Sequence, residues 1–423
     1  MKRIISLLTV AFIVFATSSL CYAEPEIKGK SALLASLKSQ QIVYSKNSDA
    51  KVAPAEFTKL MTAYTTYKIY GTDKVITVAE NIGDFTNYPE TRMNLKAGEA
   101  LSSESLIYGM LMGQANDAAV AVALNYGGID DFVARMNDYA KGLGMANTKF
   151  TNVTGSNDEN QYTTADDLLK LFRAFYADKN LYAFLSRKSV TIPATNLSSE
   201  RTYWTKNHLM SRFIYLDYYY DYALAGISSS SSYGGYSVIS SAEKGTKELV
   251  CIVLNSVYEN GVNYSMPDAM DLFNYGFDKF STVTVTKQGD LLYEAELKNQ
   301  RGRDTMLLVA DSTLKALILD DDSIESIEKE VIVDEPVSAP LKKGDKVGKV
   351  VYKYKGNIVG EINLDASEDV NRSIIKTIFS GFKWFFGLKA VKIVILVLLC
   401  AVGIFFALIL NTANKGKRRN RKR

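Results

Sequence analysis

The alternation of apolar and polar residues divides most of the chain into two regions with different patterns. Between residues 24 and 280, strand-like runs lie at both ends and helical periodicity fills the middle. The strand-like runs are Ser31–Ser36, Gln41–Tyr44, Tyr236–Ala242 and Leu249–Leu254, and the helical stretches are Phe57–Tyr70, Ser103–Met112, Ala115–Asn125, Ile129–Leu143 and Ala165–Tyr176. The last two strands are joined by a polar turn around Lys244, which predicts a hairpin. Strands that flank a block of helices predict an α+β layered domain and not a series of βαβ units.

The region from 281 to 367 has the shorter period of β-strands. Its alternating runs are separated by turns that contain Gly, Asp and Pro. The clearest of these runs are Val283–Val285, Asp304–Val309, Ile327–Val333 and Lys349–Tyr354. The pattern predicts a small all-β domain.

Three further segments follow at the C-terminus. Residues 368–390 place apolar side chains at spacings of three and four, which predicts an amphipathic helix on a membrane surface or packed on the β domain. Residues 391–411 contain the apolar run from Ile393 to Leu410, long enough for a transmembrane helix, although a buried core helix is the alternative. Aromatic residues before this run and the basic tail at 412–423 favour a single span with a cytoplasmic tail.

The N-terminus has the three parts of a secretory signal peptide. Lys2 and Arg3 precede the apolar run from Ile4 to Ala16, and small residues end the segment near Ala23. The sequence predicts cleavage after residues 1–23, with a retained anchor or a buried helix as the alternatives. Together with the C-terminal span, this places the bulk of the chain on the outer side of the cell membrane.

Charge and composition exclude several functions. The chain carries a net +4, but its two N-terminal cations and the seven in its tail account for +9, so the body carries −5. An acidic body lacks the electrostatic footprint of a nucleic-acid-binding protein. The single histidine, His208, excludes multi-histidine zinc sites and argues against serine–histidine hydrolase mechanisms.

Several motifs resemble those of one enzyme family. They are Ala53–Ala63, Leu95–Glu99, Gly109–Ala119, Leu143–Phe150, Tyr162–Asp167, Thr205–Leu209 followed by Gly226 and Ile227, and Ala339–Gly348. In this order and spacing they resemble the serine-type D-alanyl-D-alanine carboxypeptidases, the low-molecular-mass penicillin-binding proteins of peptidase family S11. The resemblance covers about residues 30 to 367. It implies a penicillin-binding, β-lactamase-like domain, in which helices cover an antiparallel sheet, followed by a β domain that acts as a stalk.

The catalytic motifs of that family are altered in this chain. Such enzymes use S-x-x-K, S-x-N and K-T-G. The corresponding segments here read Glu56-Phe57-Thr58-Lys59, Gln114-Ala115-Asn116 and Ser228-Ser229-Ser230. The nucleophile position therefore holds Glu56, Lys59 and Asn116 are retained, and Ser228 stands where a lysine is expected. The third segment is one residue shorter than the family pattern, so its register is left open.

These replacements imply weak or absent catalysis. A carboxylate is a poor nucleophile towards an amide, and Glu56 would pair with Lys59 and keep it charged. Removing the nucleophile of a serine hydrolase costs about 10⁶ in kcat. The resemblance implies three alternative functions. The first is a non-catalytic homologue that binds peptidoglycan stem peptide or a cell-wall enzyme. The second is an active carboxypeptidase with a rearranged site built from Lys59, Asn116 and a serine of 228–230, and the third is an interaction scaffold with a vestigial cleft. It implies no metal or organic cofactor.

Each candidate residue also has a structural reading. Glu56 and Lys59 fit a helix-surface pair, and Asn116 fits a helix cap. The serines from 228 to 232 fit a flexible or edge-strand segment, and His208 fits a structural hydrogen bond near the cleft. The aromatic and acidic run from Asp217 to Tyr222 fits a solvated loop packed on itself, or a binding patch.

Overall fold

The computed structural model describes residues 24–85, 91–212, 216–298, 300, 304–373, 378, 385 and 388–420. The predicted signal peptide lies outside these residues, as do residues 374–377, 379–384, 386 and 387 of the amphipathic helix predicted at 368–390. The chain divides into two compact units. The larger comprises Met1–Val283, Lys315–Ile327 and Lys353–Gly360, and the smaller comprises Thr284–Leu314, Glu328–Tyr352 and Glu361–Arg423.

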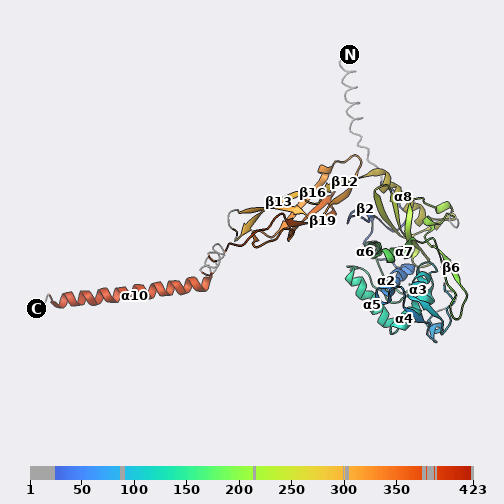
Figure 1. Ribbon diagram of the computed structural model, residues 1–423, viewed down its shortest axis with the longest axis horizontal. Coiled ribbons are helices and arrows are strands. Elements are labelled where there is room, and N and C mark those ends of the chain that lie inside the picture. Colours follow the sequence, from blue (N-terminus) through green and yellow to red (C-terminus); the bar gives the residue numbers. More distant parts are fainter. Residues whose placement is uncertain are drawn as a thin grey trace, which may run out of the picture. The chain divides into compact units, whose positions relative to one another are not determined.

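A five-stranded antiparallel sheet forms the centre of the larger unit (Figure 1). In spatial order its strands are β2 (Ile42–Lys46), β1 (Ser31–Ser36), β9 (Lys247–Ser256), β8 (Gly235–Lys244) and β7 (Ala223–Ser231). Strands β8 and β9 form the predicted hairpin. Strand β7 lies at one edge of the sheet, so Ser228–Ser231 belong to an edge strand, one of the two structural interpretations predicted for this segment.

The helices of this unit cover both faces of the sheet. They are η1 (Ala55–Phe57), α2 (Thr58–Tyr70), α3 (Ser103–Leu111), α4 (Asn116–Tyr126), α5 (Ile129–Gly142), α6 (Ala165–Ala177), α7 (Lys179–Ser186) and α8 (Ser265–Lys279). Successive residues of a strand point to opposite faces. Leu33 of β1 accordingly joins the main core with α2 to α6, whereas Leu34 approaches Gly276 of α8. The five helices predicted from periodicity all form.

Short elements connect these layers. The two-stranded ladders are β3 (Val75–Thr77) with β4 (Ala100–Ser102), β5 (Ser189–Ile192) with β6 (Arg201–Trp204), and β10 (Tyr258–Glu259) with β11 (Val262–Asn263). Single turns of 3-10 helix are η2 (Ile82–Phe85), η3 (His208–Met210) and η4 (Leu216–Tyr218).

The aromatic run from Asp217 to Tyr222 packs partly on itself, because the rings of Tyr220 and Tyr222 meet with centroids 5.6 Å apart, but it is also anchored to a helix. Tyr220 is buried and stacks on Phe273 of α8, with ring centroids 5.6 Å apart. Its hydroxyl donates to Asn274 Oδ1 at 2.9 Å. The expectation of a solvated loop did not include this anchor, because α8, which carries a proline at its third residue, was not predicted as a helix.

The smaller unit is built from β-strands, as predicted. Its main sheet has the order β16 (Ile327–Val333), β18 (Lys346–Tyr354), β19 (Asn357–Ala366), β14 (Thr305–Ala310), β13 (Leu291–Lys298) and β17 (Val337–Ser338). Strands β12 (Phe280–Thr286) and β15 (Leu314–Leu319) pair with each other, and η5 (Ile324–Ser326) precedes β16. Most residues of these three elements, Phe280–Val283 and those within Lys315–Ile327, belong to the larger unit. In the smaller unit, Val350, Leu308 and Leu364 are fully buried and form its centre.

The C-terminal helix α10 spans Lys389–Asn420. Large apolar side chains on it are exposed, among them Ile393, Leu399 and Phe405. Within the described part of the chain, however, no helix combines the length and the apolar character that crossing a membrane requires. The span predicted at 391–411 is therefore not confirmed.

Candidate functional site

Glu56 and Lys59 lie where the chain turns from η1 into α2. Glu56 is the central residue of η1, and Lys59 is the second residue of α2, so both side chains lie on one face of a continuous helical turn. Lys59 Nζ is 2.5 Å from Glu56 Oε2. The lysine side chain is 1% exposed and the glutamate side chain 24% exposed. The pair is thus largely buried, and the helix-surface interpretation of the sequence is wrong.

A second acceptor completes the environment of the Lys59 ammonium. Lys59 Nζ also donates to the carbonyl oxygen of Thr154 at 2.7 Å. Burying an ammonium is costly unless it is paired and hydrogen-bonded. The carboxylate and the carbonyl meet this requirement, and together they engage the Lys59 Nζ from two sides.

Close backbone packing fixes the start of this segment. Ala55 has a φ of 45°, which is unusual for a residue with a side chain. Gly155, which follows Thr154, has a φ of +87°, and a Cβ added there would lie 1.9 Å from the Ala55 carbonyl oxygen. The Tyr233 hydroxyl donates to the Gly155 carbonyl on the same loop. Only glycine allows the loop to approach Ala55 so closely.

Gln114 connects the second motif to the edge strand β7. Its side-chain Nε2 donates to the Ser228 carbonyl oxygen at 2.7 Å. Gln114 itself has a φ of 53°, a strained conformation for a glutamine. The Ser228 hydroxyl in turn donates to the Lys206 carbonyl. A hydrogen bond therefore joins Gln114 and Ser228, the two residues that differ from the family motifs at these positions.

Ser229 lies beside Glu56. Its Oγ accepts a hydrogen bond of 3.4 Å from the Glu56 backbone N–H, so a donor that could stabilise developing negative charge at this position is occupied by a side chain. Ser230 is exposed and lines a different cavity of about 610 Å³, which also contains Tyr236 and Tyr258. Glu56, Lys59, Gln114, Ser228 and Ser229, linked by these contacts, are called the motif cluster below.

Asn116 does not cap helix α4. It is the first residue of that helix, and the cap position is occupied by Ala115, which makes no side-chain capping bond. The Asn116 N–H donates to the Thr91 carbonyl at 2.9 Å, and the residue is 8% exposed. The capping interpretation of the sequence fails because Asn116 already lies inside the helix, whereas a cap at Asn116 would require the helix to begin at Asp117.

A cavity of about 410 Å³ lies next to the motif cluster. It includes Gly113, which precedes Gln114, and Lys206, whose carbonyl accepts from Ser228. Two cationic residues and two aromatic residues are among those that line it: Arg92, Lys206, Tyr203 and Trp204. Trp204 is 49% exposed. An anionic group with an adjacent apolar part would be complementary to such a cavity.

A buried ion pair supports strand β6, which forms one wall of this cavity. Arg201 Nη2 lies 2.8 Å from Glu99 Oε1, and Glu99 is fully buried. Although burial raises the pKa of Glu99, hydrogen bonds from Thr195, the Lys96 N–H and Arg201 outweigh it and lower that pKa below its ordinary value. Arg201 Nε also donates to the Met93 carbonyl at 3.1 Å. The pair therefore fixes β6 against the segment that carries Met93.

His208 lies just after the strand and loop that line the cavity. Its ring stacks on Tyr218, with centroids 6.1 Å apart. Burial, with a smaller contribution from Lys206, lowers the pKa of His208 to about 4. His208 is therefore neutral at pH 7.

The comparisons with known proteins agree with this architecture. The family described as D-alanyl-D-alanine carboxypeptidase matches residues 19–257, and the family described as penicillin-binding protein 5, C-terminal domain, matches residues 280–372. The first match alone covers more than half of the chain. This chain belongs to the D-alanyl-D-alanine carboxypeptidase family.

The relatives extend over nearly the whole chain. D-alanyl-D-alanine carboxypeptidase DacF of Bacillus subtilis is 25% identical over 389 residues, which is 88% of this chain and 96% of DacF. DacC of Escherichia coli is 27% identical over 364 residues, 82% of this chain and 85% of that protein. The crystal structure of penicillin binding protein 5 from Haemophilus influenzae superposes with a TM-score of 0.67 at 24% identity, covering 83% of this chain and 99% of the other. The larger unit thus has the penicillin-binding fold, followed by the β domain of this family.

Sequence reasoning missed several residues of the site. It did not identify Thr154 and Gly155, which complete the Lys59 environment, or Lys206 and Trp204 in the adjacent cavity. A lone glycine between polar residues is the one sequence signal for Gly155. The contacts of Lys59 with Thr154 and of Gln114 with Ser228 join residues about a hundred positions apart, and no local pattern indicates them.

Proposed function

We propose that this chain is a non-catalytic D-alanyl-D-alanine carboxypeptidase homologue that acts in peptidoglycan metabolism by binding the stem peptide. One observation carries the proposal: the nucleophile position holds Glu56, whose carboxylate pairs at 2.5 Å with the buried Lys59. The family membership and the names of the relatives support the link to peptidoglycan.

The chemistry of the motif cluster supports the loss of catalysis. A serine mechanism needs a hydroxyl activated by a base. Glu56 supplies no hydroxyl, and Lys59 Nζ is engaged by the Glu56 carboxylate and the Thr154 carbonyl. The Glu56 N–H is engaged by Ser229, so a backbone donor for a tetrahedral intermediate is also occupied.

The adjacent cavity supports peptide binding. Lys206 supplies positive charge in place of the missing third-motif lysine, and Trp204 and Tyr203 offer apolar surface for an alanine side chain. In our proposal the terminal carboxylate of the stem peptide lies near Lys206. Its attraction to an ammonium in a partly enclosed cavity exceeds the attraction between the same charges in water.

We further propose that the chain is anchored in the cell membrane by residues 391–411, with its bulk outside the cytoplasm. The apolar run of the sequence and the exposed apolar side chains of α10 support this placement. The full chain should remain with membranes after alkaline extraction. Release of the chain by that treatment would contradict the anchor.

Intact-mass analysis after incubation with a β-lactam tests the loss of catalysis. The full-length wild type should gain no mass, because no activated hydroxyl is present. The variant Glu56→Ser restores a hydroxyl beside Lys59 and serves as the positive comparison. A wild type that gains one β-lactam mass would refute the proposal.

That outcome would favour an active carboxypeptidase with a rearranged site, the second candidate. The relatives named above are carboxypeptidases, and this chain matches them over most of their length. In addition, Ser229 places a hydroxyl beside the Glu56 N–H. Peptide mapping of the modified protein would then locate the acylated residue. Modification of Ser229 would identify the replacement nucleophile.

Binding is tested separately by titrating the full chain with a stem pentapeptide that ends in D-Ala-D-Ala. We expect Lys206→Glu to weaken binding about tenfold or more, because it replaces an attractive charge with a repulsive one. Lys141→Glu, on the exposed surface of α5, is the matched control. A wild type that does not bind the peptide would instead favour recognition of a cell-wall enzyme or a scaffold role.

A further inference from the structure

The larger unit contains a second polar feature, separate from the motif cluster. It is a groove of about 700 Å³, lined by eleven residues that include Lys28, Lys30, Lys46 and Lys51. We call it the lysine groove. None of its described lining residues is acidic, although the body of the chain carries a net negative charge. A local excess of positive charge on an acidic body needs an explanation.

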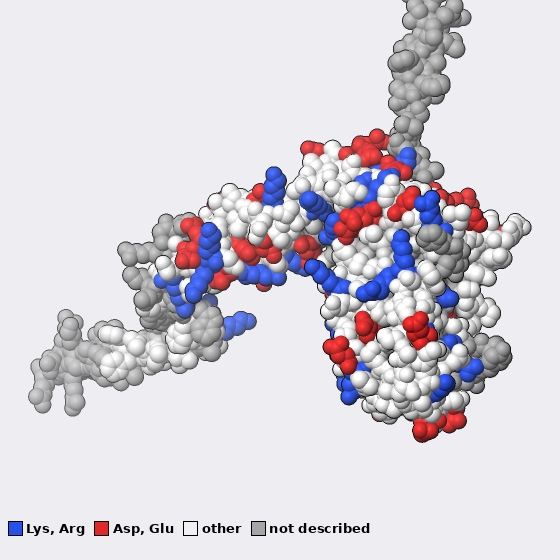
Figure 2. All heavy atoms as spheres, turned by 45° about the vertical axis from the view of Figure 1, so that its right-hand side comes forward, with Lys and Arg blue, Asp and Glu red and all other residues white. Residues whose placement is uncertain are grey.

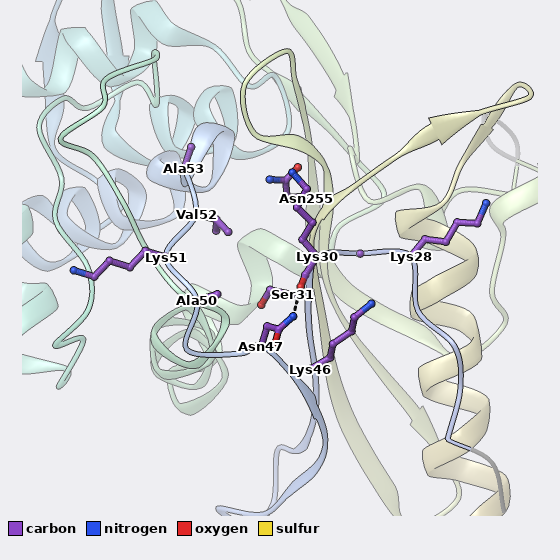
Figure 3. A pocket seen from close by; sticks show the side chains of 11 residues that line it. Lys28, Lys30, Ser31, Lys46, Asn47, Ala50, Lys51, Val52, Ala53 and Asn255 are labelled. Carbon is purple, nitrogen blue, oxygen red and sulfur yellow. Dashed lines mark hydrogen bonds between the residues drawn. The ribbon is translucent and has the colours of Figure 1, made fainter.

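The lysines are distributed along the groove. Figure 3 shows Lys51 at one end and Lys28 at the other, with Lys30 and Lys46 between them, and their side chains point in different directions. They therefore form no single cage around a small anion. Such a row is complementary to a ligand that carries several separated negative charges.

Much of this charge is not neutralised within the chain. Lys28 pairs with Glu259 at 2.8 Å, and Lys46 donates to the Ile27 carbonyl. Lys51 lies over the Tyr162 ring at 4.0 Å. Lys30 and Lys51 are exposed and form no ion pair with any described residue. An ammonium has three donors, so a single carbonyl contact leaves Lys46 able to bind an anion.

The groove wall also contains a buried hydroxyl. Ser31 is fully buried, and its Oγ has no hydrogen-bond partner among the described residues. Leaving such a group unsatisfied is costly. The neighbouring Lys30 backbone is held on both sides, because its N–H donates to the Asn255 carbonyl at 3.4 Å and its carbonyl accepts from Asn47 Nδ2 at 3.1 Å. Residues 30 and 31 are thus fixed in the wall, with a donor available.

The composition of the lining narrows the ligand class. It contains lysines and no arginine, so it lacks the planar fork that recognises carboxylates in a bidentate manner. It also contains no aromatic residue, whereas grooves for single-stranded nucleic acid combine positive charge with aromatic stacking. We propose that the lysine groove binds an extended phosphodiester polymer that carries no bases, with its charges along the lysine row and one phosphate oxygen near Ser31.

Titration of the full chain with short poly(glycerol phosphate), over a series of salt concentrations, tests the proposal. The variant Lys30→Glu/Lys51→Glu should weaken binding at least tenfold at low salt and reduce the salt-dependence slope by about 2, one for each lost contact. The control is Lys141→Glu/Lys179→Glu, which makes the same charge change on exposed positions of α5 and α7. The basic tail is present in every variant, so the difference between the two variants measures the groove alone.

The variant Ser31→Ala separates the contribution of the hydroxyl to binding from that of the lysine charges. It should lower the affinity several-fold and leave the salt slope unchanged, since no charge is removed. Equal losses in the two double variants would overturn the proposal, because binding would then follow net charge. A single-stranded oligonucleotide of equal charge that binds more tightly through the same lysines would assign the groove to nucleic acid. If binding to phosphatidylglycerol vesicles depends on these lysines and binding to the free polymer does not, the groove would be assigned to a membrane surface.

Discussion

In the motif cluster, the Lys59 side chain is 1% exposed, and its ammonium contacts a carboxylate and a carbonyl. In the lysine groove of the same unit, Lys30 and Lys51 are exposed and form no ion pair with the described residues. The cluster satisfies its polar groups within the chain, through bonds that join η1, the loop at Thr154 and strand β7. The groove leaves charge and one hydroxyl for an external partner.

Because of this difference, we expect the motif cluster to contribute to stability and the lysine groove to contribute to ligand binding. Polar groups that are buried and mutually satisfied add rigidity, and removing one of them leaves its partner buried and unpaired. Exposed charges contribute little to stability, but they attract ligands and determine the salt dependence of binding. Figure 2 shows that acidic and basic side chains are interspersed over the visible face of the larger unit. Substitutions in the cluster should therefore change stability, and those in the groove should change binding.

The largest effect is expected at Gly155. The variant Gly155→Ala must place a Cβ against the Ala55 carbonyl and also hold alanine at positive φ, so we expect a loss of about 3–4 kcal/mol of unfolding free energy. Gly144→Ala is the matched control, because Gly144 has a φ of +75° with no atom within 4 Å of the added Cβ. It should cost only about 1–2 kcal/mol. Equal costs in equilibrium denaturation would show that the loop does not press on Ala55.

Glu56→Ala should have the next largest effect. It leaves the buried Lys59 with the Thr154 carbonyl but without its counter-charge. We therefore expect the free energy of unfolding to fall by about 2–3 kcal/mol. This is less than for a fully buried pair, because the Glu56 side chain is 24% exposed. Lys30→Ala in the groove should stay within about 0.5 kcal/mol of wild type. Adding Lys59→Met to Glu56→Ala should recover part of the loss. Similar stabilities of Glu56→Ala and Lys30→Ala would contradict the distinction between the regions.

Acid should weaken the region around the cluster through His208. Its pKa of about 4 in the folded chain lies below the ordinary value of 6.5, so the unfolded chain binds more protons between these values. The contribution of His208 to stability is therefore complete above about pH 6.5 and is lost as the pH falls towards 4. Between pH 7 and pH 5 we expect the free energy of unfolding to fall by about 2 kcal/mol through this residue. His208→Asn should remove this part of the pH dependence, and identical profiles for both proteins would refute the assignment.

The sequence predicted elements better than it predicted the site. The helix at Phe57–Tyr70 and the hairpin around Lys244 follow from periodicity and turn residues, which are local properties. For the serines of strand β7 the sequence left a flexible segment and an edge strand as alternatives, because a run of serines has no apolar alternation. The positive φ values of Ala55 and Gln114 depend on contacts with Gly155 and Ser228, which only the folded chain brings near. The presence of Glu56 beside Lys59 could be read from the sequence, but their burial could not.

A smaller effect, at Gln114, separates the loss of a hydrogen bond from the relief of backbone strain. Gln114→Ala removes the amide bond to the Ser228 carbonyl but keeps the strained φ of 53°, so it should cost about 1 kcal/mol. Gln114→Gly loses the same bond and relieves the strain, so the two contributions should nearly cancel.

The groove offers a parallel case in Asn47, whose φ is 47° and whose amide donates to the Lys30 carbonyl. Asn47 is exposed, so water replaces the lost bond, and asparagine tolerates this conformation better than other residues with side chains. Asn47→Gly should therefore be close to neutral, whereas Asn47→Ala should cost more than Asn47→Gly, because alanine tolerates the positive φ less well than asparagine. Thermal denaturation of the four variants side by side measures these costs. If Asn47→Gly costs as much as Gln114→Ala, then burial does not set the value of these bonds, and the contrast between cluster and groove rests on charge alone.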